Sequence, residues 1–468
     1  MERNNKKRGI RIGVTATILL GIAVIAGYIY LTAYPSGIQP PLGRTIGFSA
    51  FEFDADQGCE IHLPTGSHIT IPAKSVVNEK GRPVHGKVRL KFREYHTPED
   101  IFLSGIPMQR SEDRDAYLQS GGMFEIRLDQ KGKPLQLKAD EAVSVDLANY
   151  RNANVGDDFK LYFLTDDTEW DSGRMFETVP NFRRDTALTN LQPPPSAPIN
   201  PVPGADERLF GLQFDPRMLP HLKAWRNTTF EYLKHKNGLP FEDALRVDWD
   251  GLKIKEGEQQ GDLEFTFSFT RTNVKMEPVK HHSSFIARPM LSGAELENVL
   301  AQFREDMDKY AETIEKLDQE RQRIEQEAVM LSRFTVAQVG VFNIDYLSKM
   351  DVVRVEMSFD FDEEINPLFN QIMLHVVLED RNTVVKYNFA DWDEIPALNE
   401  RVSLVAVLPG GKVAYVSADQ YLQKIRPDDL RPGSQYKFRF TTERIEMNDF
   451  FDRFLKRNTV RGSTPRII

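Results

Sequence analysis

Hydrophobic and polar residues alternate along much of this chain, and a period of two is typical of β-strands with one buried face. The pattern first holds from about residue 45 to residue 150, and it is clearest in Val88–Arg93 and Val143–Leu147. Between such runs lie Asn78–Gly81 and Asp129–Gly132, whose sequences suit tight hairpin turns. Short strands separated by these turns predict an antiparallel β-sandwich.

The same alternation returns in two later regions. From Glu207 to Leu291 the most regular stretch is Leu263–Phe269, which follows a predicted helix around Leu219–Leu233. The strands predicted after Phe334 are Val353–Phe361, Ile372–Leu378, Val402–Leu408, Val413–Val416 and Tyr436–Phe440. A short amphipathic helix is expected near the C-terminus, at Phe450–Leu455.

Between Ser292 and Arg333 the hydrophobic period changes to alternating spacings of four and three. The positions of this heptad seam are Leu296, Leu300, Phe303, Met307, Tyr310, Ile314, Leu317, Arg321, Ile324, Ala328 and Leu331. Such a seam predicts one helix of ~40 residues, roughly 60 Å long. The flanking positions are mostly acidic, which disfavours a parallel homodimer. An internal hairpin, an antiparallel pair or a basic partner helix would suit these charges. The remaining alternative is a long helix that lies on its own domain.

The N-terminal segment carries the clearest targeting signal. Ile12–Tyr34 contains 23 residues and no charge, and five cations precede it (Arg3, Lys6, Lys7, Arg8 and Arg11). A helix of that length spans a hydrocarbon core of ~30 Å, and the flanking cations favour a cytoplasmic N-terminus. A cleaved signal peptide is the alternative, but its apolar run is usually only ~7–15 residues long. We therefore predict an uncleaved signal anchor with the bulk of the chain periplasmic or otherwise extracytoplasmic.

Two proline-rich segments are predicted to be extended and non-helical. Pro35–Pro41 would form a stiff spacer after the anchor, and Asn190–Pro203 would link two globular regions. Proline lacks the backbone donor that the interior of a sheet requires, so neither segment is expected inside one.

Composition excludes some classes of function. The formal net charge is −9, and it becomes more negative without the basic N-terminus, so the chain is a poor candidate for binding nucleic acid. Cys59 is the only cysteine in the sequence, which excludes an intrachain disulfide and a thiolate zinc cluster. We interpret Cys59 as a small buried hydrophobic residue.

The search for catalytic motifs finds none of the common nucleophile, phosphate-binding or zinc-protease signatures. The acidic clusters at 360–364 and 391–394 are candidate calcium loops, although neither has the EF-hand spacing. His281 and His282 are adjacent, and neighbouring residues on a strand face opposite sides, so we do not expect them to share a metal ion. From the sequence we assign no catalytic, cofactor-binding or metal-ligating residue.

Several short motifs resemble a known module. Gly58–Ile61, Ile69–Ala73 and Gly86–Leu90 are similar to the early strands of a ZU5-type β-sandwich. Ser120–Ile126 and Gly132–Leu135 resemble the version found in a family of uncharacterised bacterial envelope proteins. That family also has counterparts of Leu219–Trp225, Phe285–Leu291 and Gly340–Asp345. The resemblance implies a β-rich extracytoplasmic architecture and supplies no catalytic residues.

These observations together predict a mainly β protein with tandem antiparallel β-sandwich domains, one N-terminal transmembrane helix and one long heptad-patterned helix. The predicted order is a cytoplasmic tail (1–11), a signal anchor (12–34), a linker (35–44), a ZU5-like sandwich (45–150), a connecting segment with the Pro-rich linker (151–206), a β-rich domain (207–291), the long helix (292–334), a C-terminal β-sandwich (335–445) and a short helix with a tail (446–468).

The preferred functional interpretation is a non-enzymatic, single-pass protein of the cell envelope that binds a protein partner or scaffolds an assembly. The helix at 292–334 would be the interaction element. The alternative is an envelope hydrolase or carbohydrate-processing protein with a site between β modules, and a small-ligand or calcium-binding module is a third hypothesis.

Overall fold

The structure of the protein is a computed structural model. It describes residues 38, 40–110, 113–150, 158–165, 169–191, 198–272, 278–349, 353–361, 365, 372–410, 412–426, 430–431 and 436–456. The predicted anchor Ile12–Tyr34 lies outside these residues. Within them, no helix is both long enough and apolar enough to cross a membrane.

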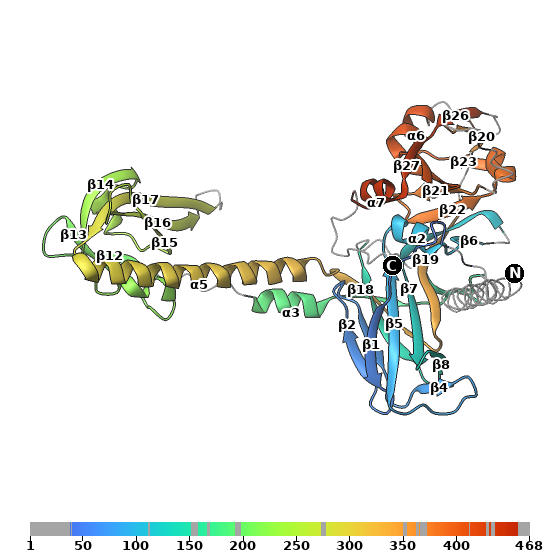
Figure 1. Ribbon diagram of the computed structural model, residues 1–468, viewed down its shortest axis with the longest axis horizontal. Coiled ribbons are helices and arrows are strands. Elements are labelled where there is room, and N and C mark those ends of the chain that lie inside the picture. The colour runs from blue at the N-terminus through green and yellow to red at the C-terminus, as the bar shows by residue number, and fades with distance from the viewer. Residues whose placement is uncertain are drawn as a thin grey trace, which may run out of the picture. The chain divides into compact units, whose positions relative to one another are not determined.

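The described chain is mainly β and divides into two compact units (Figure 1). The discontinuous unit combines the chain up to Arg184 with the chain from Gln326 onward. The inserted unit is Asp185–Glu325. The predicted tandem order of domains is therefore wrong at this level, because one unit interrupts the sequence of the other.

The N-terminal part of the discontinuous unit contains two sheets. The first sheet runs in the order β1-β5-β7-β19-β10, with β4, β6 and β8 attached to this path. The second sheet has the order β11-β18-β9-β3-β2. The strands of the first sheet are β1 (Ser49–Asp54), β4 (Val76–Asn78), β5 (Lys87–Tyr95), β6 (Gln109–Arg110), β7 (Asp113–Gln130), β8 (Lys133–Leu137), β10 (Lys160–Phe163) and β19 (Gly340–Lys349). Those of the second are β2 (Cys59–His62), β3 (His68–Ile71), β9 (Val143–Asn149), β11 (Glu177–Pro180) and β18 (Met330–Val336).

Both sheets contribute to one hydrophobic core. Leu90, Phe92 and Phe124 from the first sheet are fully buried with Ile69 and Val145 from the second. The predicted alternation is confirmed in β3 and β5, whose residues largely alternate between this core and the outer faces. In β9 it is weaker, because the residues from Val145 to Asn149 are all buried. The two predicted hairpin turns are confirmed as well. In the second of them, Lys131 and Gly132 both have positive φ, as a type I′ turn between β7 and β8 requires.

Strands from beyond the inserted unit complete both sheets. Strand β18 pairs with β9 and β11, and β19 pairs with β7 and β10. The first domain therefore does not end at residue 150, and β19 does not belong to the C-terminal domain as predicted. The entry to and exit from the insertion are adjacent, because the backbone N–H of Asn181 donates to the carbonyl of Val329 (2.8 Å) and its side-chain amide donates to that of Ala328 (3.0 Å).

The C-terminal part of the discontinuous unit contains two more sheets around a second core. One has the order β22-β21-β24-β25-β27 and the other β23-β20-β26. The strands are β20 (Val353–Asp360), β21 (Leu374–Leu378), β22 (Thr383–Tyr387), β23 (Ile395–Ala397), β24 (Val402–Leu408), β25 (Lys412–Val416), β26 (Lys437–Thr441) and β27 (Glu443–Glu446). The helical elements are η2 (Phe389–Glu394), α6 (Ala418–Lys424) and α7 (Met447–Lys456). The predicted strands are confirmed within a few residues, but β20 and β26 pair in parallel, so this domain is not purely antiparallel.

A third core joins the two parts of this unit. Phe102 of α2 (Pro98–Ser104) packs edge-to-face on Phe450 and Phe454 of α7. Ile38 and Leu42 are buried in the same core, at 4% and 7% exposure. Of the predicted linker 35–44, the described residues Ile38 and Leu42 therefore pack against the body of the unit.

The inserted unit is built on one antiparallel sheet, in the order β12-β13-β14-β17-β16-β15. Its elements are β12 (Asn200–Pro203), β13 (Leu209–Gln213), η1 (Pro220–Trp225), β14 (Phe230–Gly238), α4 (Phe241–Ala244), β15 (Gly251–Glu256), β16 (Leu263–Thr272), β17 (Pro278–Pro289) and α5 (Gly293–Glu325), preceded by α3 (Phe182–Asn190), which begins before the boundary. Figure 1 shows the sheet beside the N-terminal part of α5.

Three sequence predictions are corrected in this region. The helix predicted around Leu219–Leu233 is only a single 3₁₀ segment, because β14 begins at Phe230. The Pro-rich segment ends in β12, an edge strand, where missing backbone donors are tolerated. The long helix ends at Glu325, and Leu331 of the predicted seam lies in β18. Leu331 fitted the predicted heptad spacing by coincidence. A strand with alternating apolar residues also places some of them three or four positions apart.

Candidate functional site

The heptad seam of α5 faces its own domain. Phe303 is 6% exposed and packs against Trp225 of η1 with ring centroids 5.4 Å apart. About two helical turns further along, Tyr310 stacks on His221 with ring centroids 3.9 Å apart. Of the arrangements left open by the sequence, the helix lying on its own domain is the one observed in this part of α5.

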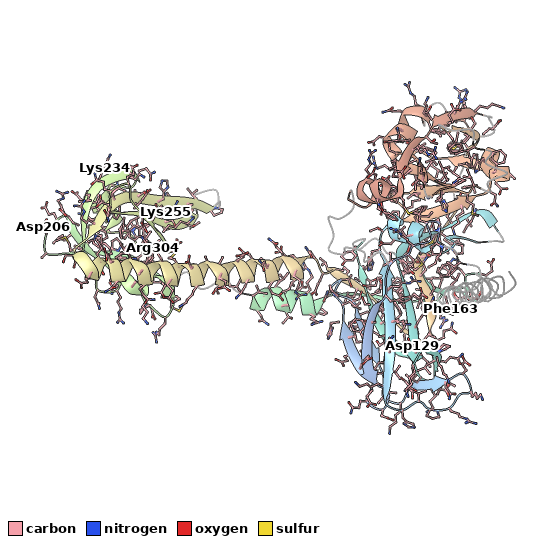
Figure 2. All side chains as sticks on the ribbon, viewed as in Figure 1. Asp129, Phe163, Asp206, Lys234, Lys255 and Arg304 are labelled. Carbon is pink, nitrogen blue, oxygen red and sulfur yellow. The ribbon has the colours of Figure 1, made fainter. Side chains whose placement is uncertain are left out.

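The face of α5 away from the seam is charged and exposed. Lys309 pairs with Glu305 and Lys316 with Glu312, each at 2.6 Å and one turn apart. Arg304 reaches instead to Glu256 of β15, near Lys255, which Figure 2 labels together with Arg304. Exposed pairs of this kind contribute little to stability, because water and salt screen them. They keep the helix soluble and leave its packed face to provide most of the stability.

A groove of 310 Å³ lies between α5 and the loop before η1. Met218, Pro220 and Tyr310 supply its apolar lining, and Met218 remains 36% exposed. Charged and polar side chains line the rest of the groove, namely Arg217, Asp306, Lys309 and Thr313. Arg217 is held in place by its pair with Asp215, a bond that lowers the pKa of that carboxyl to about 2. The groove therefore combines an apolar lining with a charged and polar rim.

The acidic clusters and the adjacent histidines that the sequence analysis considered lie on different elements of the structure. Asp360 forms an ion pair with Arg439, and the rest of that acidic cluster at 362–364 lies outside the described residues. In the second acidic cluster Trp392 is buried within η2. His281 stacks on Phe269 with ring centroids 4.8 Å apart, as expected for a strand residue facing its cross-strand neighbour.

Cys59 is half-buried and packs against the first core. Burial raises the pKa of its thiol to about 11, so the group is protonated at neutral pH. This agrees with the interpretation of Cys59 as a small hydrophobic residue.

One buried polar network contains the residue types of a hydrolase. Ser67 and Thr65 donate hydrogen bonds to the carboxylate of Glu94, and His96 contacts the same carboxylate at 3.4 Å. In nucleophilic catalysis the histidine lies between the hydroxyl and the acid. Here the carboxylate lies between them, and Ser67 also accepts a hydrogen bond from the backbone of Ala148. The arrangement ties the turn between β2 and β3 to β5 and β9 rather than activating the serine.

A polar row crosses the outer face of the second sheet. The strand register places side by side His62, His68, Asp146, Arg333 and Glu177, one from each strand. Arg333 donates two hydrogen bonds to Asp146 at 2.8 and 2.9 Å. At the edge of the sheet the imidazole rings of His62 and His68 stack, and Glu60 lies on the same face two residues before His62.

The sequence search missed this histidine pair because it looked only for adjacent histidines. The sequence did contain a signal for this pair. His62 and His68 each lie three positions from Thr65, which is the centre of the turn sequence Pro64-Thr65-Gly66. A hairpin centred on that turn places the two histidines opposite each other.

Comparison of the chain with models of known protein families, with curated proteins and with solved structures finds no match.

Proposed function

We propose that this protein is a membrane-anchored, extracytoplasmic protein of the cell envelope that holds a partner protein in the groove beside α5. The observation that carries the proposal is that groove, with its apolar lining from Met218 and Tyr310 and its charged rim from Arg217 and Lys309. The occupant we infer is an extended segment of a partner protein that inserts an apolar side chain. Large apolar side chains with an aromatic neighbour are the usual anchors of such contacts.

The proposal also includes a membrane anchor at the N-terminus. The uncharged segment Ile12–Tyr34 and the cations before it support a single membrane span with the described units outside the cytoplasm. The two facing sheets around one core support a sandwich of the ZU5-like kind for the N-terminal part of the discontinuous unit. Such a unit would serve as the platform, and the inserted unit would supply the binding groove.

We include no enzymatic step. Ser67 is fully buried, and Glu94 separates it from His96, so this group has neither the access nor the order that nucleophilic catalysis requires. A hydrolase activity would need a different set of residues.

The test compares partner recovery by three full-length chains after cross-linking in the native host. Met218→Asp places a charge on the groove lining, and Met290→Asp places the same charge on a more exposed methionine of the inserted unit, outside the groove. We expect one or more partners to be recovered with the wild type and with Met290→Asp and to be lost with Met218→Asp. Recovery of the same partners by all three chains would overturn the groove as the binding site. Fractionation of the wild type away from the membrane would overturn the anchor.

A further inference from the structure

The edge of the second sheet presents three metal-binding side chains on one surface. Glu60 and His62 lie two residues apart on β2, so both point to the outer face, while Ile61 between them points into the core. His68 on β3 lies directly opposite His62. Ile69, the next residue, is fully buried. The core therefore fixes the backbone positions from which all three ligand side chains project.

The geometry of the three groups is close to that of a metal site. The rings of His62 and His68 stack with centroids 4.3 Å apart and an angle of 11° between their planes. One ligand atom from each of Glu60, His62 and His68 lies within 4.8 Å of the others. Ligand atoms around a tetrahedral zinc ion are ~3.4 Å apart, given bonds of ~2.0–2.1 Å. Because an imidazole nitrogen binds a metal in the plane of its ring, the stacked rings must turn before both can bind one ion, and the exposed side chains of Glu60 and His62 have room to turn.

A second observation concerns the inner histidine. Nε2 of His68 is enclosed and has no hydrogen-bond partner among the described residues. An enclosed polar atom of this kind costs stability unless something binds it. A cation bound in the plane of the His68 ring would accept the lone pair of Nε2.

The charges around the site are compatible with a cation. Glu60 brings a negative charge, and both histidines must be neutral in order to bind. Asp146, on the far side of His68, is occupied by Arg333 and is not needed as a ligand.

We propose that Glu60, His62 and His68 form a surface site for a divalent transition-metal ion of the zinc class. Two imidazole nitrogens and one carboxylate oxygen would bind the ion, and water would complete its coordination. Mixed nitrogen and oxygen ligands of this kind select zinc and its neighbours over magnesium and calcium. The site lies in the discontinuous unit and is independent of the groove beside α5.

The test is calorimetric titration of the purified full-length protein with Zn²⁺, using Mg²⁺ as the control ion. We expect one Zn²⁺ per chain and no saturable binding of Mg²⁺. His62→Ala should weaken Zn²⁺ binding about tenfold or more, and Glu60→Gln severalfold. His281→Ala, which removes an exposed histidine from another strand, should leave the affinity unchanged.

Two further measurements keep the outcome unambiguous. His62 is exposed, so its alanine variant should unfold at the wild-type temperature without metal and should lack the increase that Zn²⁺ gives the wild type. Cobalt substitution should give visible absorption bands without a strong thiolate band, and Cys59→Ser should not alter them. Equal Zn²⁺ affinity in the wild type and His62→Ala, or loss of binding in Cys59→Ser alone, would overturn the site.

Discussion

Phe124 of β7 and Phe334 of β18 stack with ring centroids 5.4 Å apart and an angle of 26° between their planes. The two residues belong to different sheets, and the whole inserted unit lies between them in the sequence. Their contact therefore closes the first core with a segment that is made only after the insertion. It follows that the N-terminal domain depends on residues far beyond residue 150.

The first prediction concerns the insertion itself. Replacing Asp185–Glu325 with a short Gly/Ser linker should leave the discontinuous unit folded, because Asn181 and Ala328 are already hydrogen-bonded on either side of the insertion. A chain that stops at Arg184 should fail to fold, since it lacks β18 and β19. Cooperative thermal unfolding and near-UV circular dichroism of the two proteins provide the comparison. A stably folded truncated chain would contradict the topology.

Phe334→Ala should destabilise the discontinuous unit by about 3–5 kcal/mol, because it removes a large side chain from a closed core. Phe182→Ala is the matched control: this ring is 71% exposed, and its loss should change stability by less than about 0.5 kcal/mol. Urea unfolding monitored by fluorescence gives both values. Similar losses in the two variants would argue against the placement of β18.

A buried ion pair anchors the start of the described chain. Arg93 donates to the carboxylate of Glu125 (Nε to Oε2, 2.7 Å) and to the carbonyl of Ile46 (3.0 Å), and its guanidinium lies 4.2 Å from the ring of Phe48. Glu125→Gln should cost about 3–5 kcal/mol, because it leaves the buried Arg93 without its counter-charge. The same carboxylate also pairs with the less buried Arg127.

The double variant Arg93→Met/Glu125→Leu provides the comparison for that pair. Removing both charges together should cost less than Glu125→Gln alone, since the fully buried Arg93 is no longer left uncompensated and only the more exposed Arg127 loses its pair with Glu125. Urea unfolding of the two variants measures the difference. A double variant that is the less stable of the two would show that the pair itself, rather than charge balance, stabilises the fold.

The acid sensitivity of the C-terminal domain should depend on His375. This residue is 3% exposed and lies opposite Lys386 across β21 and β22. Burial, together with the cation of Lys386, lowers the pKa of His375 from 6.5 to about 3. Between those pH values the unfolded chain binds one proton more than the folded chain, so folding stability is lost as the pH falls through this window.

The expected slope is about 1.4 kcal/mol per pH unit for this one group. His375→Phe removes the titrating ring and keeps an aromatic partner for Phe102, which packs edge-to-face on the histidine at 4.9 Å. Urea unfolding of both proteins at several pH values between 6.5 and 4 should show a steeper loss in the wild type. Parallel profiles would rule out His375 as the source.

Local sequence pattern was sufficient for the individual elements. Leu263–Phe269 alternates strictly and lies in β16, and the turn at Lys131–Gly132 has the positive φ that its residues favour. The start of α5 and its packed seam were equally readable, because helix periodicity is set by residues only three or four apart. These features depend on near neighbours in the chain.

Which distant segments pair with one another was decided by the tertiary structure. The spacing at Ala328 and Leu331 fits a helix seam, but hydrogen bonds to β9 and β11 make Met330–Val336 a strand. From the sequence, Ile38 and Leu42 were assigned to a linker, but in the structure both are buried in the third core. The candidate metal ligands became visible only when the β2–β3 register set His68 opposite His62.

The sequence by itself determined the β-rich composition, the long helix and the apolar N-terminal segment, since each is recorded in the spacing of residues close together in the chain. Only the tertiary structure decided that one unit is inserted into another, that α5 packs on its own sheet, and that Glu60, His62 and His68 meet. The physical reason is that sheet pairing and core packing depend on contacts between segments that are far apart in the sequence. The alternation of a single strand does not specify which other strand it will pair with.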